Sequence, residues 1–224
     1  MTSALQTADA ITTLDLPPKF DVTKFPREVE EYLAMLDNPF HLAIGRNYFR
    51  HLLLEISGHW DQILVPHLTI DEPIYRIGDR GTTIVAIGHE EVLAFYRKTA
   101  EDRKNVMGAL TMNMCIEDFG VVTEARWAEV ATGTTVREHG IDAGPGTHYL
   151  ILHNIFQLFG YTLDAKLIGE RVYDDPASYQ YVQLDPVDVV TPEMAREQLI
   201  PYLERAVKMH EASPWDASKY VPSP

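Results

Sequence analysis

The sequence has one cysteine, few basic residues and no long apolar run, and each shortage excludes a class of protein. Cys115 alone cannot form an intrachain disulfide or a cysteine-built zinc site, as expected in a reducing cytoplasm. With 19 Lys and Arg against 33 Asp and Glu, the formal charge is −14, whereas proteins that bind nucleic acid or anionic membranes gather positive charge on one face. No stretch approaches the roughly 18 apolar residues of a membrane helix, and the N-terminus lacks signal-peptide features. We therefore expect a cytoplasmic protein that binds neither nucleic acid nor membrane.

The length of 224 residues and the hydrophobic content of 46% predict one main domain with an additional segment at each end. We expect an N-terminal arm over residues 1–25, the main domain over 26–185, and a C-terminal helix with a tail over 186–224. Trp215 and Tyr220 stand out in this tail, because aromatic side chains add no stability when the segment that carries them is disordered. We expect them to dock on the body of the protein or on a second subunit.

Hydrophobic periodicity predicts helices first and strands later. Apolar residues at helical spacing predict helices that begin near Pro26, after Asn38, at His89 and after Thr191. Asn38 and Thr191 are the predicted N-terminal caps of their helices. The segments "LTIDEPIYRI" and "TTIVAIG" bracket the turn "GDRG" and predict a hairpin. After residue 105 the period changes to two over long segments of antiparallel type. Helices packed on one side of an antiparallel sheet define an α+β domain.

This order of elements, over roughly residues 39–175, resembles the nuclear transport factor 2-like superfamily. The likeness includes a meander that ends with Phe159, Asp164, Lys166, Ile168, Tyr173 and Asp174. It implies a curved antiparallel sheet that forms a cone closed by N-terminal helices, an α+β barrel, here with an extra C-terminal helix. Members such as scytalone dehydratase, SnoaL-type polyketide cyclases, ketosteroid isomerase and limonene epoxide hydrolase act on compact, largely apolar ring substrates. Other members only bind proteins.

Alignment with scytalone dehydratase implies which side chains enter the pocket. On one strand these are Ala125, Trp127, Glu129 and Ala131, and on the next they are His148, Leu150, Leu152, Asn154, Phe156 and Leu158. Asn154 then matches a position that hydrogen-bonds the ligand. The two catalytic histidines of that enzyme have no counterpart here.

Glu129 is the predicted catalytic acid or base. A carboxyl group between apolar neighbours loses hydration, which suits it to proton transfer near neutral pH. If the strand is bulged or its register is shifted by one residue, Glu129 instead faces solvent. His148, beside the glycine-rich "GIDAGPG", and Asn154 are expected to hold or polarise a substrate oxygen. The predicted substrate-binding side chains are Glu72, Tyr75, Trp127, Phe156 and Tyr48.

Other chemistries have less support in the residues. The aspartate–arginine–aspartate positions of limonene epoxide hydrolase are occupied by Ala125, Trp127 and Val172, and Arg126 points to the other face unless the strand is bulged. No pair of histidines has metal-ligand spacing, and only His139, Asp142 and His148 could converge in a loop. No glycine-rich loop opens a helix, so we expect neither a metal nor a nucleotide cofactor.

The residues and the resemblance together predict a cofactor-independent acid–base enzyme. It would be a dehydratase, isomerase or cyclase acting on a small, largely apolar cyclic substrate. The alternatives are a non-catalytic module that binds a ligand or a protein, and an epoxide hydrolase. The resemblance also implies a homodimer, because members of the superfamily commonly pair through the outer face of the sheet.

Overall fold

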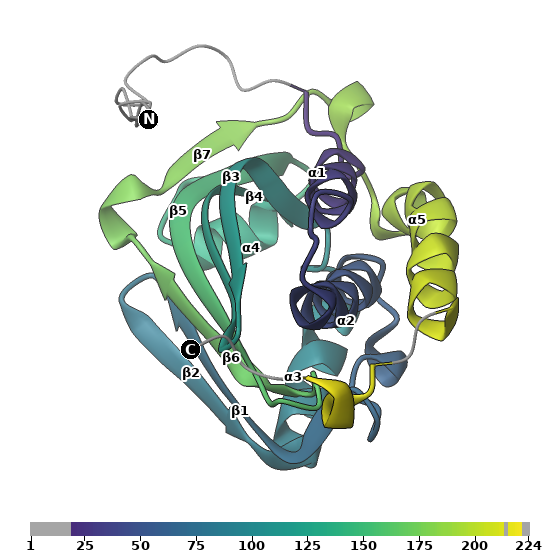
Figure 1. Cartoon of the computed structure of the whole chain (residues 1–224). Coiled ribbons are helices and arrows are strands. Elements are labelled where there is room, and N and C mark those ends of the chain that lie inside the picture. The colour runs from purple at the N-terminus through teal and green to yellow at the C-terminus, as the bar shows by residue number, and fades with distance from the viewer. Residues whose placement is uncertain (1–18, 213–214, 221–224) are drawn as a thin grey trace, which may run out of the picture.

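The computed structural model describes residues 19–212 and 215–220 (Figure 1). The helices are α1 (Lys24–Leu33), α2 (Pro39–Ile56), α3 (Gly88–Glu101), α4 (Gly133–Glu138) and α5 (Pro192–Ala212). The strands are β1 (Thr69–Asp79), β2 (Thr82–Ile87), β3 (Met107–Glu117), β4 (Gly120–Thr132), β5 (His148–Tyr161), β6 (Leu167–Asp174) and β7 (Gln180–Gln183). Short 3-10 helices lie at Trp60–Gln62, Pro176–Ser178, Pro186–Asp188 and Ala217–Lys219.

The strands form one seven-stranded sheet in the order β2-β1-β6-β5-β4-β3, and β7 pairs with β5 outside this path. All neighbours run antiparallel except β1 and β6, which run parallel. The sheet curves round α1 and α2, and α5 packs on the side of α2 that faces away from the sheet (Figure 1). This is the arrangement implied by the resemblance to the nuclear transport factor 2-like superfamily. The predicted α+β fold with an extra C-terminal helix is confirmed.

The central helix α2 starts where its sequence places a cap. The Asn38 side chain accepts hydrogen bonds from the backbone N–H groups of Phe40 (2.9 Å) and His41 (3.4 Å). Pro39 occupies the first helical position, where a backbone N–H is not needed. Helix α2 is largely buried because the sheet covers one side of it and α5 packs against another. It can therefore present side chains to the interior of the cone.

Both ends of the described chain pack on the body. Phe20 and Val22 are buried in the core, whereas residues 1–18 of the predicted arm lie outside the described residues. The Trp215 ring stacks on Phe40 at a centroid distance of 5.1 Å. The Tyr220 hydroxyl donates a hydrogen bond of 2.8 Å to Asp118. The tail aromatics thus dock on their own subunit. None of the helices in the described ranges combines the length and hydropathy that crossing a membrane requires.

Candidate active site

A cavity of about 200 Å³ is lined by the sheet, by α2 and α3, and by connecting segments. Much of its wall is apolar, with the aromatic rings of Phe25, Phe95, Trp127 and Phe159. Set into this wall are the polar side chains of Tyr48, His51, Glu55, Glu129, His153 and Glu170. A largely apolar pocket with a few convergent polar groups is typical of a small-molecule site.

The pairing of β4 with β5 decides which side chains face the cavity. Trp127 lies opposite His153, and Ala125 lies opposite Ile155. Residues directly opposite each other in an antiparallel pair share a face of the sheet. The predicted inward face of β4 is therefore observed, with Trp127 and Glu129 in the cavity wall. On β5, however, the residues that line the cavity are the odd-numbered His153, Ile155, Gln157 and Phe159.

The predicted inward face of β5 is wrong by one residue. Asn154 is exposed, and its side-chain oxygen accepts a hydrogen bond of 3.2 Å from Arg126. Phe156 is 43% exposed, so neither residue lines the cavity. His148 pairs with Thr132 at the start of β5 and is also outside the lining. The strand is apolar at both parities, so its periodicity could not select the buried face, and a shift of one residue reverses every side chain.

The remaining predicted binding residues divide between the cavity and its surroundings. Tyr48 and Trp127 line the cavity. Tyr75 is fully buried but lies outside the lining, with its ring edge-on to Tyr96 at 5.7 Å. Glu72 is exposed and outside the lining, because its position on β1 places it beside the start of α3. The predicted mouth pair Glu72 and Tyr75 therefore does not form.

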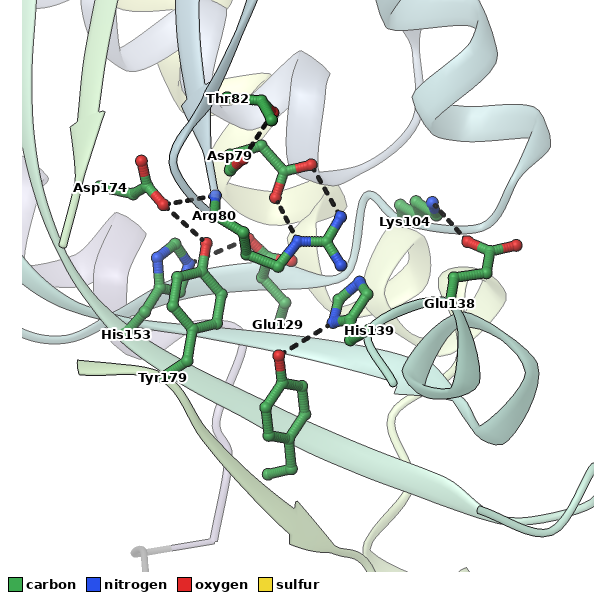
Figure 2. Close-up of polar contacts among 11 residues, drawn as sticks. Asp79, Arg80, Thr82, Lys104, Glu129, Glu138, His139, His153, Asp174 and Tyr179 are labelled. Atoms are coloured by element: carbon green, nitrogen blue, oxygen red, sulfur yellow. Dashed lines mark hydrogen bonds and ion pairs between the residues drawn. The ribbon is translucent and has the colours of Figure 1, made fainter. Parts of the chain in front are cut away.

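Glu129 and His153 form a polar pair in the cavity wall. Oε1 of Glu129 lies 3.2 Å from Nε2 of His153, and the Glu129 side chain is 35% exposed (Figure 2). The Tyr179 ring stacks on the imidazole at 4.5 Å, and its hydroxyl donates a 3.2 Å hydrogen bond to Asp174. Nδ1 of His153 is buried and has no hydrogen-bond partner among the described residues. The stacking and the contact with Glu129 hold the imidazole in place.

A second polar cluster lies deeper and joins α2, α3 and β6. The Tyr96 hydroxyl lies 2.8 Å from Nε2 of His51 and 3.3 Å from Oε2 of Glu170. Oε2 of Glu55 lies 3.9 Å from the same His51 nitrogen. His51, Tyr96 and Glu170 are buried and the Glu55 side chain is 17% exposed, so a charge on any of these groups would be poorly hydrated.

Burial shifts the pKa values of this deep cluster toward the uncharged forms. It raises the pKa of Glu170 to about 8, against an opposing hydrogen bond from Tyr96. Burial also raises the pKa of Glu55 well above its usual value, and the neighbouring carboxyl groups of Glu170 and Glu129 add to the effect. It lowers the pKa of His51 to about 3. A raised pKa favours the protonated form of a carboxyl group, and that form can donate a hydrogen bond.

His153, Glu55 and Glu170 were not predicted as site residues. Tyr48, His51 and Glu55 recur at positions three and four residues apart on α2, and this polar stripe in an apolar helix was the available signal. Glu170 stands beside Arg171, so alternation could not tell which of the two points inward. Its partner Phe159 on β5 settles the question.

Two alternatives considered from the sequence can be compared with the structure. Arg126 lies on the outer side of the sheet and donates to Asn154 and to the Ser178 carbonyl, and none of the acids in the described ranges forms an ion pair with it. Within residues 19–212 and 215–220, no group of three or more His, Cys, Asp or Glu side chains could hold a metal ion, including His139 with Asp142 and His148.

Comparisons with known proteins found likenesses at the level of structure. No family model and no curated protein matches the sequence. One similar structure is described as a SnoaL-like polyketide cyclase from Jannaschia sp. CCS1, with 16% identity, a TM-score of 0.43, and coverage of 63% of this chain and 91% of that chain. Another is SalBIII, an epoxide hydrolase/cyclase-like enzyme with a role in pyran ring formation in salinomycin, with 13% identity, 68% and 95% coverage and a TM-score of 0.41. A third is the phenazine biosynthesis-related protein PhzB2 from Pseudomonas aeruginosa, with 11% identity, 73% and 85% coverage and a TM-score of 0.37.

Proposed function

We propose that this protein is an acid–base enzyme, a dehydratase, isomerase or cyclase, that acts on a small, largely apolar cyclic molecule with its own side chains. The observation that carries the proposal is the Glu129–His153 pair, which opens on the same apolar cavity as the buried acids Glu55 and Glu170. Such chemistry needs one group that takes a proton and another that gives one. Different environments suit the two groups to these opposite roles.

The size and lining of the cavity support a ring-shaped ligand. An apolar cavity of about 150 Å³ is known to hold benzene. The cavity here, of about 200 Å³, has room for one ring with substituents. Aromatic walls exclude water, so electrostatic interactions with a bound molecule are stronger than in solution.

In this mechanism Glu129, held beside His153, takes a proton from a carbon next to a carbonyl group. The electron pair of the broken C–H bond forms a carbon–carbon double bond, the π pair of the carbonyl moves to its oxygen, and the protonated forms of the Glu55 and Glu170 carboxyl groups donate hydrogen bonds to that oxygen. In an isomerisation the proton returns to another carbon atom. In a dehydration a new carbon–carbon double bond forms, the C–O bond breaks, and the hydroxyl group takes a proton from a buried acid and leaves as water.

The two rival functions have less support from the geometry. A non-catalytic module would be favoured by a cavity filled with its own side chains, but Phe156 lies outside it and the Trp127 ring rests edge-on against Phe25 at 5.4 Å. An epoxide hydrolase of the expected kind would need Arg126 beside an acid in the cavity.

The test of the proposal is proton exchange at carbon. Small cyclic ketones such as cyclohexanone and 2-tetralone are incubated with the protein in deuterium oxide, and loss of the α-proton signal is followed by NMR. We expect the wild-type protein to catalyse exchange and the double variant Glu129→Gln, His153→Gln to lose it. Equal rates for the two proteins, or no catalysed exchange by the wild type, would reject the proposal.

The homodimer implied by the resemblance stays a prediction. The outer face of the sheet exposes large apolar side chains, including those of Ile74, Val85, Phe156 and Tyr173. A surface of this kind suits contact with a second copy. Light scattering coupled to size-exclusion chromatography measures the mass directly, and a monomer at micromolar concentration would contradict the prediction.

A further inference from the structure

Arg80 occupies a backbone position that an arginine rarely takes. It lies in the two-residue turn between β1 and β2, with φ of 48°, and Gly81 follows with φ of 79°. Hairpin turns with two successive positive φ angles strongly favour Asn-Gly or Asp-Gly, because asparagine and aspartate tolerate this conformation better than longer side chains do. The turn alone therefore gives no reason for an arginine at this position.

The strained residue is fixed from two sides. Its backbone N–H donates a 2.6 Å hydrogen bond to Oδ2 of Asp174. Its Nε and Nη2 donate to the two carboxylate oxygens of Asp79, at 2.8 and 3.0 Å (Figure 2). Strained backbone persists where the surroundings hold it firmly, and it gathers at ligand sites. The guanidinium group is thus preorganised before any ligand arrives.

One edge of this guanidinium remains available. Asp79 engages Nε and Nη2, while Nη1 donates no hydrogen bond within residues 19–212 and 215–220. Arg80 lines the cavity together with Lys104 and His139. Figure 2 shows the three side chains. The contact of Lys104 with Glu138 is long, at 3.9 Å. A planar guanidinium edge matches the two oxygens of a carboxylate.

The basic side chains of the lining give an anion a place to bind. Burial raises the pKa of Glu55 and of Glu170 and so favours their uncharged forms. The lining also contains Asp79 and Glu129, which are matched in number by Arg80 and Lys104. An incoming carboxylate therefore meets two basic side chains, and Asp79 already orients the guanidinium of one of them.

We propose that Arg80 binds a carboxylate group of the substrate, so that the substrate is a small cyclic carboxylic acid. The ring enters the apolar cavity, and the acid group stays at the mouth between Arg80 and Lys104. The identity of this ligand as a substrate rests on the proposed function. Recognition of the carboxylate by Arg80 is a binding property that can be measured without turnover.

The test compares two probes of nearly equal shape. Cyclohexanecarboxylate and its neutral primary amide are titrated into the protein and followed by NMR or calorimetry. We expect the wild type to bind the acid roughly tenfold or more tightly than the amide, as a charge-assisted bidentate contact provides. Arg80→Asn, which suits the turn, should bind both probes equally. Arg76→Gln is the matched control, because Arg76 is an exposed residue of β1, the strand that leads into the turn, and lies outside the cavity lining.

Three results would overturn the carboxylate site. These are equal affinity of the wild type for acid and amide, a preference for the acid that survives in Arg80→Asn, and no binding of the acid at millimolar concentration. Exchange of α-protons in neutral ketones reports on the proposed function separately. A protein that catalyses this exchange without preferring the acid would keep its proposed function and lose the carboxylate site.

Discussion

The side chains of Trp127 and His153 lie directly opposite each other across the β4–β5 ladder, on the side of the sheet that faces the cavity. This pairing brings His153 within 3.2 Å of Glu129, two residues along β4 from Trp127. The same pairing turns Asn154 to the outer face. One cross-strand contact therefore determines which polar groups of β5 can take part in chemistry.

Replacing His153 with Gln should slow α-proton exchange by about 10²-fold, because the partner of the Glu129 carboxylate is lost. His148→Gln, at the start of the same strand but outside the cavity, should exchange at the wild-type rate. Asn154→Ala should do the same. The measurement is the NMR exchange rate at saturating ketone. Loss of activity in His148→Gln or Asn154→Ala, together with an active His153→Gln, would mean that the face of β5 predicted from the sequence is the one that faces the substrate.

Replacing Glu170 with Gln should make the protein more stable at alkaline pH. The folded chain keeps the proton of this carboxyl group up to a pKa of about 8, whereas the ordinary value of 4.5 applies when the chain is unfolded. Between these values the unfolded chain releases a proton that the folded chain holds, so wild-type stability falls as pH rises. We expect the advantage of Glu170→Gln to grow by on the order of 1 to 2 kcal/mol between pH 6.5 and 8.

The measurement is the urea midpoint of both proteins at several pH values. His51 titrates in the opposite sense, since its pKa of about 3 in the folded chain against 6.5 in the unfolded one lowers stability as pH falls below 6.5. The range above pH 6.5 therefore isolates the acids. Glu124→Gln, at an exposed position, is the control. Parallel curves for wild type and Glu170→Gln would show that Glu170 is ionised when folded.

Replacing Gly169 with Ala should destabilise the fold by about 2 kcal/mol or more. Its φ is 156°, and a Cβ atom would lie 1.9 Å from the Ile74 carbonyl oxygen on the parallel neighbour β1. Because Glu170 follows directly, the same change should displace the buried acid. Thermal unfolding measures the effect. Gly146→Ala, which meets nothing within 4 Å, is the control and should unfold like the wild type.

Replacing Arg80 with Asn should raise the melting temperature by about 1 to 3 °C, because asparagine relieves the positive φ of the turn. The lost ion pair with Asp79 is a partly exposed one, with side chains 34% and 40% accessible, and such pairs contribute little. Differential scanning calorimetry gives the result. A lower melting temperature of the variant would mean that Arg80 stabilises the turn.

The sequence is enough to predict the α+β class, the start of α2 and the inward face of β4. Asn38 with Pro39 is a local capping signal. Alternation along β4 puts Glu124 and Glu129, which are five residues apart, on opposite faces, and the resemblance to known enzymes indicates which of the two faces points inward. In β5 both faces are apolar, because neighbouring segments also partly cover the outer face. The alternation of residues along β5 therefore does not show which face points into the cavity. The deep cluster joins His51, Tyr96 and Glu170 from three separate elements, and only the tertiary fold brings these together.

The central claim is that the carboxylate of Glu129 transfers a proton inside the cavity. The most direct measurement is α-proton exchange by Glu129→Gln beside Glu124→Gln, a change at an exposed position of the same strand, with the affinity for the ketone measured in each. The account predicts a loss of at least about 10²-fold in the exchange rate of Glu129→Gln with unchanged affinity, and the wild-type rate for Glu124→Gln. Exchange by Glu129→Gln at the wild-type rate would contradict it.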